Sequence, residues 1–430
     1  MARAITDQAV SRLAPAAKGA TQGPRVILHI GEPKTGTTFL QHVIWRNRAV
    51  LAAQGVILPG HHPQDHFRAS QDLTGVELAA NDPDGSWNGE WEILAEESKL
   101  ARRMAVISHE LFAAANEHQV KRAVIALSPA EVHVVLTVRD IAALLPAEWQ
   151  ETVKNRNARK WEDWLGDVID REAPARDRRQ YGFWQVHDTL KILEIWSRHV
   201  PAQHIHVITA PPRGSGSGQL WRRFASLLDI DPDSLDLSVG RANESLGLAE
   251  IEFLRRLNEE LPAELPDWYY MWRIKEGAAH ESLARRPVTE RLTLPPGRLR
   301  WAREYADQVI TGLRDSGFDL VGELDELRPR EPRGPAASPS SQPAEQVLDA
   351  AVATAAALVL NEYWREFPRQ APKPDVITRG VFADWVALKI AGSPWLKKTV
   401  RDLSGRHWVV QRLRVLAWRI LERPGVRTKS

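Results

Sequence analysis

The sequence predicts an α/β fold in which a central parallel sheet is flanked by helices and followed by a helical C-terminal extension. Two observations support this prediction. Short runs rich in β-branched residues alternate with segments of helical period, which implies right-handed βαβ units. A stretch rich in Pro, Ser and Gly near residue 330 then separates this alternating part from a purely helical pattern. In such a sheet, ligands bind beyond the carboxyl ends of the strands.

Five short apolar runs are the expected buried strands, because each ends in loop residues. They are RVILHI (25–30), GVILP (55–59), MAVIS (104–108), VHVVLTV (132–138) and HIHVITA (204–210). Helices are expected between them over 37–54, 142–155 and 185–199, and the pattern is helical from about residue 241 onward.

The domain organisation follows from shifts in composition. We expect a flexible N-terminal extension over 1–23, an α/β domain over 24–327, a Pro/Ser-rich linker over 328–344 and a basic helical region over 345–430. No apolar run approaches the roughly 18 residues that a membrane-spanning helix needs.

Composition excludes several classes of site. The chain has 430 residues and no cysteine, which rules out disulfides, thiolate metal sites and cysteine nucleophiles and is typical of a cytoplasmic protein. A net charge of +2 gives no argument for nucleic acid as a partner.

The segment VILHIGEPKTGTTFLQ, which begins at Val26, places a compact loop between the first strand and the first helix. The first amide groups of a helix lack backbone partners and carry partial positive charge. Gly36 lets a ligand approach the backbone, and Lys34 adds a full positive charge. The available hydroxyl donors are Thr35, Thr37 and Thr38. The loop therefore predicts a phosphate or sulfate cradle, unless it is only a glycine-containing turn.

The order of residues in this loop indicates which anion it binds. The nucleotide-triphosphatase pattern has its lysine directly after the second glycine, where this chain has Thr37. The order Pro-Lys-Thr-Gly-Thr-Thr instead resembles the 5′-phosphosulfate loop of sulfotransferases that use 3′-phosphoadenosine 5′-phosphosulfate (PAPS), especially their bacterial branch. The resemblance implies a P-loop-like three-layer fold with PAPS bound by Pro33, Lys34, Thr35, Gly36, Thr37 and Thr38.

The resemblance extends to the expected 3′-phosphate site. In the family an Arg after a later strand, and a Ser eight residues further on, bind this phosphate. Arg139 matches the first, and its planar guanidinium suits bidentate phosphate contact. Ala147 stands in place of the Ser, so a backbone amide, Trp149 or Lys154 is expected to substitute. A salt bridge to Asp140 or a helix-capping role is the alternative for Arg139.

A third resemblance follows the last expected strand, in HIHVITAPPRGSGSGQLWRRFASLLDID. The loop 211–218 either wraps the adenosine and offers Arg213 to the 3′-phosphate, or is a surface loop. Altogether the resemblance covers roughly residues 24–325.

The family chemistry is in-line transfer of a sulfuryl group to a hydroxyl or amine of an acceptor such as a carbohydrate, a glycolipid or a small metabolite, with no metal. Lys34 would neutralise charge on the leaving phosphate oxygen. Glu110 aligns best with the family's base, and His109 is the alternative. Because neighbouring side chains alternate, only one of the two should face the site. A capping or ion-paired Glu110 is the structural alternative.

Two further segments have open interpretations. In PGHHPQDHF the cluster of His61, His62, Asp65 and His66 is read as an acceptor-binding loop, a plain surface loop or, least favoured, a metal site. Trp87 and Trp91 are stacking surfaces for an acceptor or core residues.

Two alternatives for the function of the whole chain remain, and the role of the C-terminal region is open as well. The chain is a nucleotide kinase or NTPase with an atypical loop, or a non-catalytic nucleotide-binding homologue, which Ala147 keeps open. The basic C-terminal region, including HWVVQRLRVLAWRIL, either packs against protein or lies on an anionic membrane surface.

Overall fold

A computed structural model describes residues 23–76, 85–171, 182–212, 214–238, 245–262, 264–286, 288, 290–331 and 338–366 of the chain. The chain divides into two compact units, Met1–Leu358 and Val359–Ser430. The first unit holds the sheet and the site described below. The second is described only over residues 359–366, which end helix α15 (Ala344–Glu366). Residues 1–22 of the expected N-terminal extension and residues 367–430, which include the basic stretch near the C-terminus, lie outside the described residues. The domain boundaries therefore stay a prediction.

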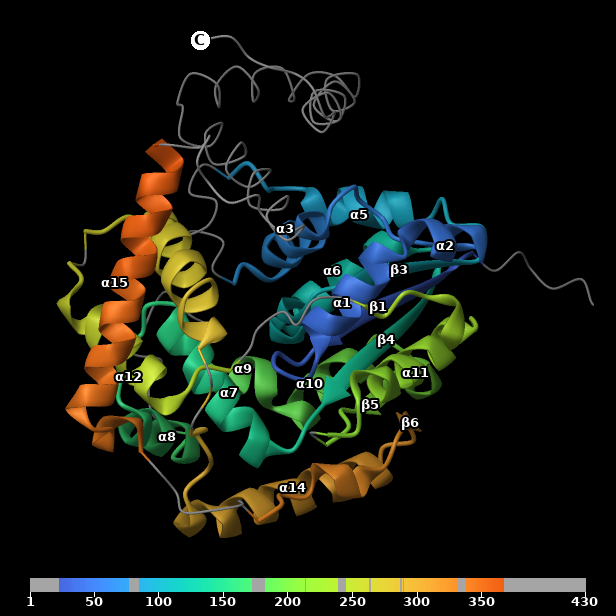
Figure 1. Cartoon of the computed structure of the whole chain (residues 1–430). Coiled ribbons are helices and arrows are strands. Elements are labelled where there is room, and N and C mark those ends of the chain that lie inside the picture. Colours follow the sequence, from blue (N-terminus) through green and yellow to red (C-terminus); the bar gives the residue numbers. More distant parts are fainter. Residues whose placement is uncertain are drawn as a thin grey trace, which may run out of the picture. The chain divides into compact units, whose positions relative to one another are not determined.

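Over the residues that the structure describes, the sheet has six strands in the order β2-β3-β1-β4-β5-β6, and all neighbouring pairs are parallel. This confirms the predicted α/β class. The strands are β1 (Arg25–Gly31), β2 (Val56–Ile57), β3 (Met104–Ser108), β4 (Glu131–Val138), β5 (Ile205–Thr209) and β6 (Asp319–Val321). All carboxyl ends therefore meet at one edge of the sheet, where the β1, β4 and β5 loops come together (Figure 1).

Helices fill the connections and both faces of the sheet. The α-helices are α1 (Thr37–Arg46), α2 (Arg48–Ala53), α3 (Pro63–Thr74), α5 (Glu90–Ser98), α6 (Glu117–Leu127), α7 (Ile141–Lys154), α8 (Trp161–Ile169), α9 (Phe183–His187), α10 (Thr189–Ser197), α11 (Ser217–Leu228), α12 (Leu248–Glu260), α13 (Asp267–Tyr270), α14 (Leu299–Arg314) and α15 (Ala344–Glu366). A 3₁₀ helix, η1 (Glu110–Ala114), follows β3, and a π-helix, η4 (Met271–His280), follows α13. Among the described residues, none of the helices combines the length and hydrophobicity needed to cross a membrane.

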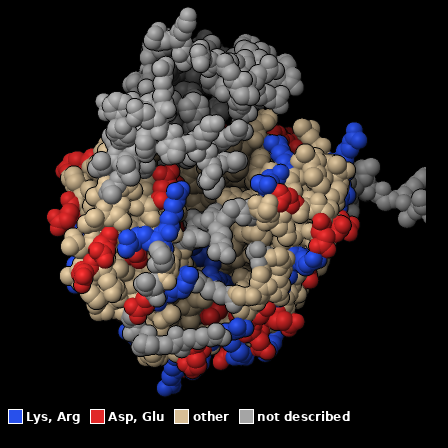
Figure 2. All heavy atoms as spheres, viewed as in Figure 1, with Lys and Arg blue, Asp and Glu red and all other residues tan. Residues whose placement is uncertain are grey.

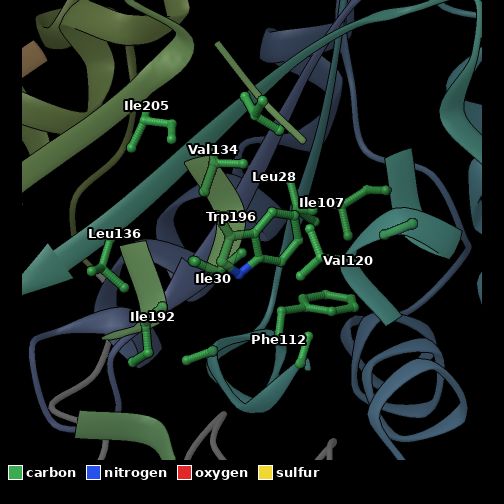
Figure 3. Packing of buried hydrophobic residues seen from close by; sticks show 14 of the residues in the cluster. Leu28, Ile30, Ile107, Phe112, Val120, Val134, Leu136, Ile192, Trp196 and Ile205 are labelled. Atoms are coloured by element: carbon green, nitrogen blue, oxygen red, sulfur yellow. The ribbon is translucent and has the colours of Figure 1, made fainter. Parts of the chain in front are cut away.

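The alternation of side chains along β1 separates two cores. Val26, Leu28 and Ile30 pack with α3, α5, α6, α10 and α14, and this cluster includes Trp196 and Phe112 (Figure 3). Ile27 points to the other face, where it packs with α1, α2 and α11. A third cluster joins α7, α8, α12 and α15 beside the sheet. The two faces of the sheet are thus both covered, as the apolar strands predict.

The structure differs from the sequence-based expectation in three elements. The helix expected over 185–199 is two helices, α9 and α10, because Asp188 ends the first and caps the second with its side chain. The helix expected over 37–54 is two helices, because Asn47 turns the chain and bonds Asp236 through its side-chain amide, with Nδ2 2.9 Å from the Asp236 carbonyl. The sequence pattern also predicts no strand at β6 (Asp319–Val321). Its three residues carry too little pattern, and only the pairing of Asp319 to Val321 with β5 makes them a strand.

Candidate active site

The loop between β1 and α1 has a backbone that curves tightly at three residues. Gly31, Lys34 and Gly36 have positive φ values of 89°, 60° and 104°. A Cβ at Gly31 would lie 2.6 Å from the Cβ of Glu110, so only glycine allows η1 to approach the loop this closely. α1 then begins at Thr37 with no side-chain cap, so its first amides face the loop. The geometry is that of an anion cradle.

The predicted ligands within this loop divide by burial. Thr35 is buried; its hydroxyl donates to the Glu32 carbonyl at 2.6 Å and lies 2.6 Å from the Thr137 hydroxyl. Its side chain therefore braces the loop against β4. Pro33 and Thr37 are also buried, whereas the partly exposed members are Lys34, Gly36 and Thr38. Ligand binding by these residues stays a prediction.

Lys34 is held by an ion pair that the sequence did not reveal. Its Nζ donates to Glu151 Oε2 on α7 at 2.7 Å, and the second oxygen of this carboxylate accepts from Lys275 Nζ of η4 at 2.9 Å. Lys275 also donates to Asn155 Oδ1 at 2.6 Å. One carboxylate thus holds two ammonium groups beside the cradle.

The charges around Glu151 perturb one another. Burial alone would raise the pKa of Glu151, but Lys34, Lys275 and Lys154 hold it well below its usual value. Burial lowers the pKa of Lys154 to about 8, with Lys34 and Lys275 adding to the effect. Burial likewise lowers the pKa of His280 to about 4, with Lys154 adding to it. Lys34, Lys154 and Lys275 thus surround Glu151, while the carboxylates Glu110, Glu148 and Glu276 also act on these lysines.

A second buried cluster lies behind the loop. His187, on α9, has its Nδ1 3.6 Å from Glu32 and its Nε2 3.6 Å from Glu148 of α7. Burial would lower the pKa of His187, but the two carboxylates raise it to about 9. Glu32 also accepts from the Thr189 hydroxyl at 2.6 Å. A protonated His187 therefore links the loop to α7, the helix that carries Glu151.

Arg139 lies where β4 ends, between the loop and a cavity. Its Nη1 donates to the carbonyl oxygen of Lys34 at 3.0 Å. It also lines a cavity of about 400 Å³ beyond the carboxyl ends of β4 and β5. Asp140 caps α7 by accepting from the Ala142 amide at 2.8 Å, so the capping role considered for Arg139 belongs to its neighbour.

The cavity lining includes Ala147, the residue at the position where the sulfotransferase family is expected to have its phosphate-binding serine. The hydroxyl-bearing Ser245 and Thr293 also line it. Two exposed guanidinium groups, Arg291 and Arg330, line it as well. Neither arginine was singled out from the sequence, because each lies more than 140 positions from Arg139 in a segment without a motif. On the face drawn as spheres in Figure 2, Lys and Arg side chains are interspersed with Asp and Glu side chains.

The two candidate bases point in different directions. Glu110 Oε2 accepts from Gln41 Nε2 of α1 at 2.9 Å, on the loop side. His109 caps η1: its Nδ1 accepts from the Leu111 amide at 3.2 Å and lies 3.1 Å from the Ser70 hydroxyl. Burial raises the pKa of Glu110, but His109, the Gln41 hydrogen bond and Lys34 together lower it. Burial lowers the pKa of His109. At neutral pH, Glu110 is thus an ionised carboxylate beside the cradle.

The histidine-rich segment PGHHPQDHF builds the start of α3. His62 is the N-cap, and the Asp65 carboxylate accepts from the amides of His61 at 2.7 Å and His62 at 3.0 Å. His66 is buried and its Nε2 lies 2.9 Å from the Pro59 carbonyl. Trp91 is fully buried, so it belongs to the core and offers no stacking surface. Arg213 lies outside the described residues.

Comparisons with known proteins add little to this description. No protein-family model and no curated protein matches the chain. The crystal structure of a sulfotransferase from Alicyclobacillus acidocaldarius is similar at 15% identity and a TM-score of 0.34, over 55% of this chain and 92% of that chain. A sulfotransferase domain from the curacin biosynthetic pathway is similar at 12% identity and a TM-score of 0.28, over 50% of this chain and 78% of that chain. Both values are too low for either neighbour to assign a family or a function to this chain.

Proposed function

We propose that the chain is a sulfotransferase that moves a sulfuryl group from PAPS to a hydroxyl or amine of an acceptor. The observation that carries the proposal is the position of Arg139. Its guanidinium holds the Lys34 carbonyl of the anion cradle and lines the cavity at the carboxyl ends of β4 and β5. A donor with anionic groups at both ends needs cationic groups at two places. Arg139 joins the cradle to the cavity, which Arg291 and Arg330 line together with Asp140, Glu326 and Glu331.

The proposed chemistry assigns one task to each side chain. The acceptor oxygen or nitrogen attacks sulfur, the bond between sulfur and the bridging phosphate oxygen breaks, and Glu110 takes the acceptor proton. Lys34 neutralises the charge that develops on the bridging oxygen. For this its ammonium leaves Glu151, whose other oxygen stays paired with Lys275. When Lys34 moves away, the buried Glu151 carboxylate therefore still has Lys275 as its cationic partner.

The acceptor and the tail belong to the same proposal. The acceptor carries a hydroxyl or amine, as a carbohydrate, glycolipid or small metabolite does. The basic C-terminal region is proposed to contact protein or an anionic membrane surface.

Thermal unfolding tests the donor site directly. At a concentration 100 times its dissociation constant, 3′,5′-adenosine bisphosphate should stabilise the fold by about 2.7 kcal/mol, whereas ATP with Mg²⁺ should have a smaller effect. Protection by ATP-Mg²⁺ alone would support the kinase alternative. Binding of the bisphosphate without transfer from labelled PAPS to any acceptor in a broad screen would instead indicate a non-catalytic homologue.

The arginines of the cavity give a second test. Arg139→Ala and Arg291→Ala should each weaken binding of the bisphosphate, by roughly 1.5–3 kcal/mol for each lost charge-assisted bond. Binding of 5′-AMP, which lacks the 3′-phosphate, should change much less. Titration calorimetry measures both ligands. Equal losses for both nucleotides would show that these arginines do not contact the 3′-phosphate. Arg300→Ala, an exposed arginine of α14, is the matched control.

The base assignment has a test of its own. Glu110→Gln keeps the hydrogen-bonding size of the side chain but cannot take a proton, so turnover should fall roughly 10²–10⁴-fold. His109→Ala should cost stability through the lost η1 cap, with a smaller loss of turnover. Near-normal turnover in Glu110→Gln together with a large loss in His109→Ala would assign the base to His109.

A further inference from the structure

A cluster of imidazole and carboxylate groups lies at the amino ends of β4, β5 and β6, the sheet edge opposite to the proposed active site. Its members are Glu131, His133, His204, His206 and Asp319. Three short contacts join four of them in a row. Glu131 Oε1 lies 2.6 Å from His133 Nε2, His133 Nδ1 lies 2.8 Å from His206 Nε2, and His206 Nδ1 lies 2.7 Å from Asp319 Oδ2.

The three contacts in this row need three hydrogen atoms, but the neutral side chains supply only two. One contact therefore lacks a proton or another cation. Two neutral imidazoles carry one N–H each and ionised carboxylates carry none. If His206 donates to Asp319 and His133 donates to His206, then the lone pair of His133 Nε2 faces the Glu131 carboxylate. Two acceptors 2.6 Å apart repel each other unless a proton lies between them or they move apart to ligate a metal ion.

A neutral imidazole and an ionised carboxylate are the forms in which histidine and glutamate bind metals. A metal ion bound by Glu131 and His133 would therefore supply the positive charge that the row of hydrogen bonds lacks.

His204 supplies a third donor. Its ring stacks on that of His133 with centroids 4.3 Å apart. One ligand atom each from Glu131, His133 and His204 lies within 4.8 Å of the others. Two imidazoles and one carboxylate form a ligand set for zinc, with the fourth position open to water.

We propose that Glu131, His133 and His204 bind one divalent ion of the zinc class, which cross-links β4 to the start of β5. His206 and Asp319 are positioning residues, because the carboxylate orients His206 and His206 orients the His133 ring. Zinc–nitrogen and zinc–oxygen bonds of roughly 2.0–2.2 Å require the Glu131–His133 contact to lengthen and the His204 ring to turn. Glu131 and His204 are both partly exposed and have room to do so.

Metal titration of the full-length, tag-free chain tests the site without reference to sulfuryl transfer. After chelator treatment, Zn²⁺ should bind with one equivalent per chain at this site and raise the unfolding temperature. Co²⁺ should give the strong visible absorption of a four-coordinate ion. His204→Gln, on the partly exposed ligand, should fold normally and abolish both effects. Asp319→Asn should weaken zinc affinity roughly 10–100-fold without abolishing it.

His118→Gln is the matched control, since His118 is exposed on α6, away from the cluster in sequence. It should leave zinc affinity unchanged. The proposal is overturned if the chelated chain binds no zinc, or if His204→Gln binds zinc with the affinity of the unaltered chain. Neither result bears on PAPS binding, so failure here and failure of the proposed function are distinguishable.

Discussion

Replacing Lys34 with alanine should lower turnover by roughly 10²–10³-fold, the usual loss when one charge-stabilising donor is removed from a transition state. Lys34 supplies the positive charge of the cradle itself. Its backbone is in the left-handed conformation, with φ at 60°, and Arg139 fixes it by donating a hydrogen bond to the Lys34 carbonyl. The fold should survive, because Glu151 keeps its second partner, Lys275, at 2.9 Å. Transfer from labelled PAPS, measured with the best acceptor of the screen, gives the turnover.

Lys99→Ala is the control for this substitution. Lys99 is a lysine paired with Glu96 outside the site, so its loss should leave turnover unchanged. Affinity for the bisphosphate should fall less than turnover in Lys34→Ala, since the lysine acts on charge that appears only during transfer. Turnover close to that of the unaltered chain would remove Lys34 from the mechanism.

Replacing His187 with glutamine should destabilise the protein by about 3–5 kcal/mol, the typical cost of removing one partner from a buried charge cluster. The substitution leaves Glu32 and Glu148 buried without the imidazolium between them. Urea unfolding at pH 7 measures the loss, and His118→Gln is the surface control. A loss no larger than that of the control would show that His187 is neutral in the folded protein.

The same cluster predicts a dependence on pH. The folded-state pKa of His187, about 9, lies above the ordinary value of 6.5. Its stabilisation is therefore complete below pH 6.5 and is lost as the pH rises through 9. Lys154 acts in the opposite sense, because its pKa is lowered to about 8 and its burial penalty is relieved above that pH. The difference in unfolding free energy between the chain and His187→Gln isolates the histidine and should shrink from pH 7 to pH 10.

Much of the fold could be predicted because its signals are local. All five expected strands are present, because each is a short run of apolar residues that favours a buried strand independently of its neighbours in the fold. The loop from Gly31 to Thr37 could be recognised as a cradle for the same reason: two glycines, a lysine and a helix start lie within seven residues.

The tertiary structure alone decided which distant side chains meet. Lys34 and Glu151 are 117 positions apart, and Arg291 reaches the cavity from a segment without periodicity or motif. Tertiary contacts also make β6 a strand, because β5 offers it hydrogen-bond partners. They likewise bring together the row of groups from Glu131 to Asp319. Hydrophobic period and backbone preference act over a few residues, whereas ion pairs and cavity walls depend on how the strands are ordered in the sheet. The sequence by itself therefore determined the shape and the donor groups of the loop from Gly31 to Thr37, for which anion binding is a prediction. The packing of α7, η4 and the loops around β4 and β5 decided which charges surround that loop.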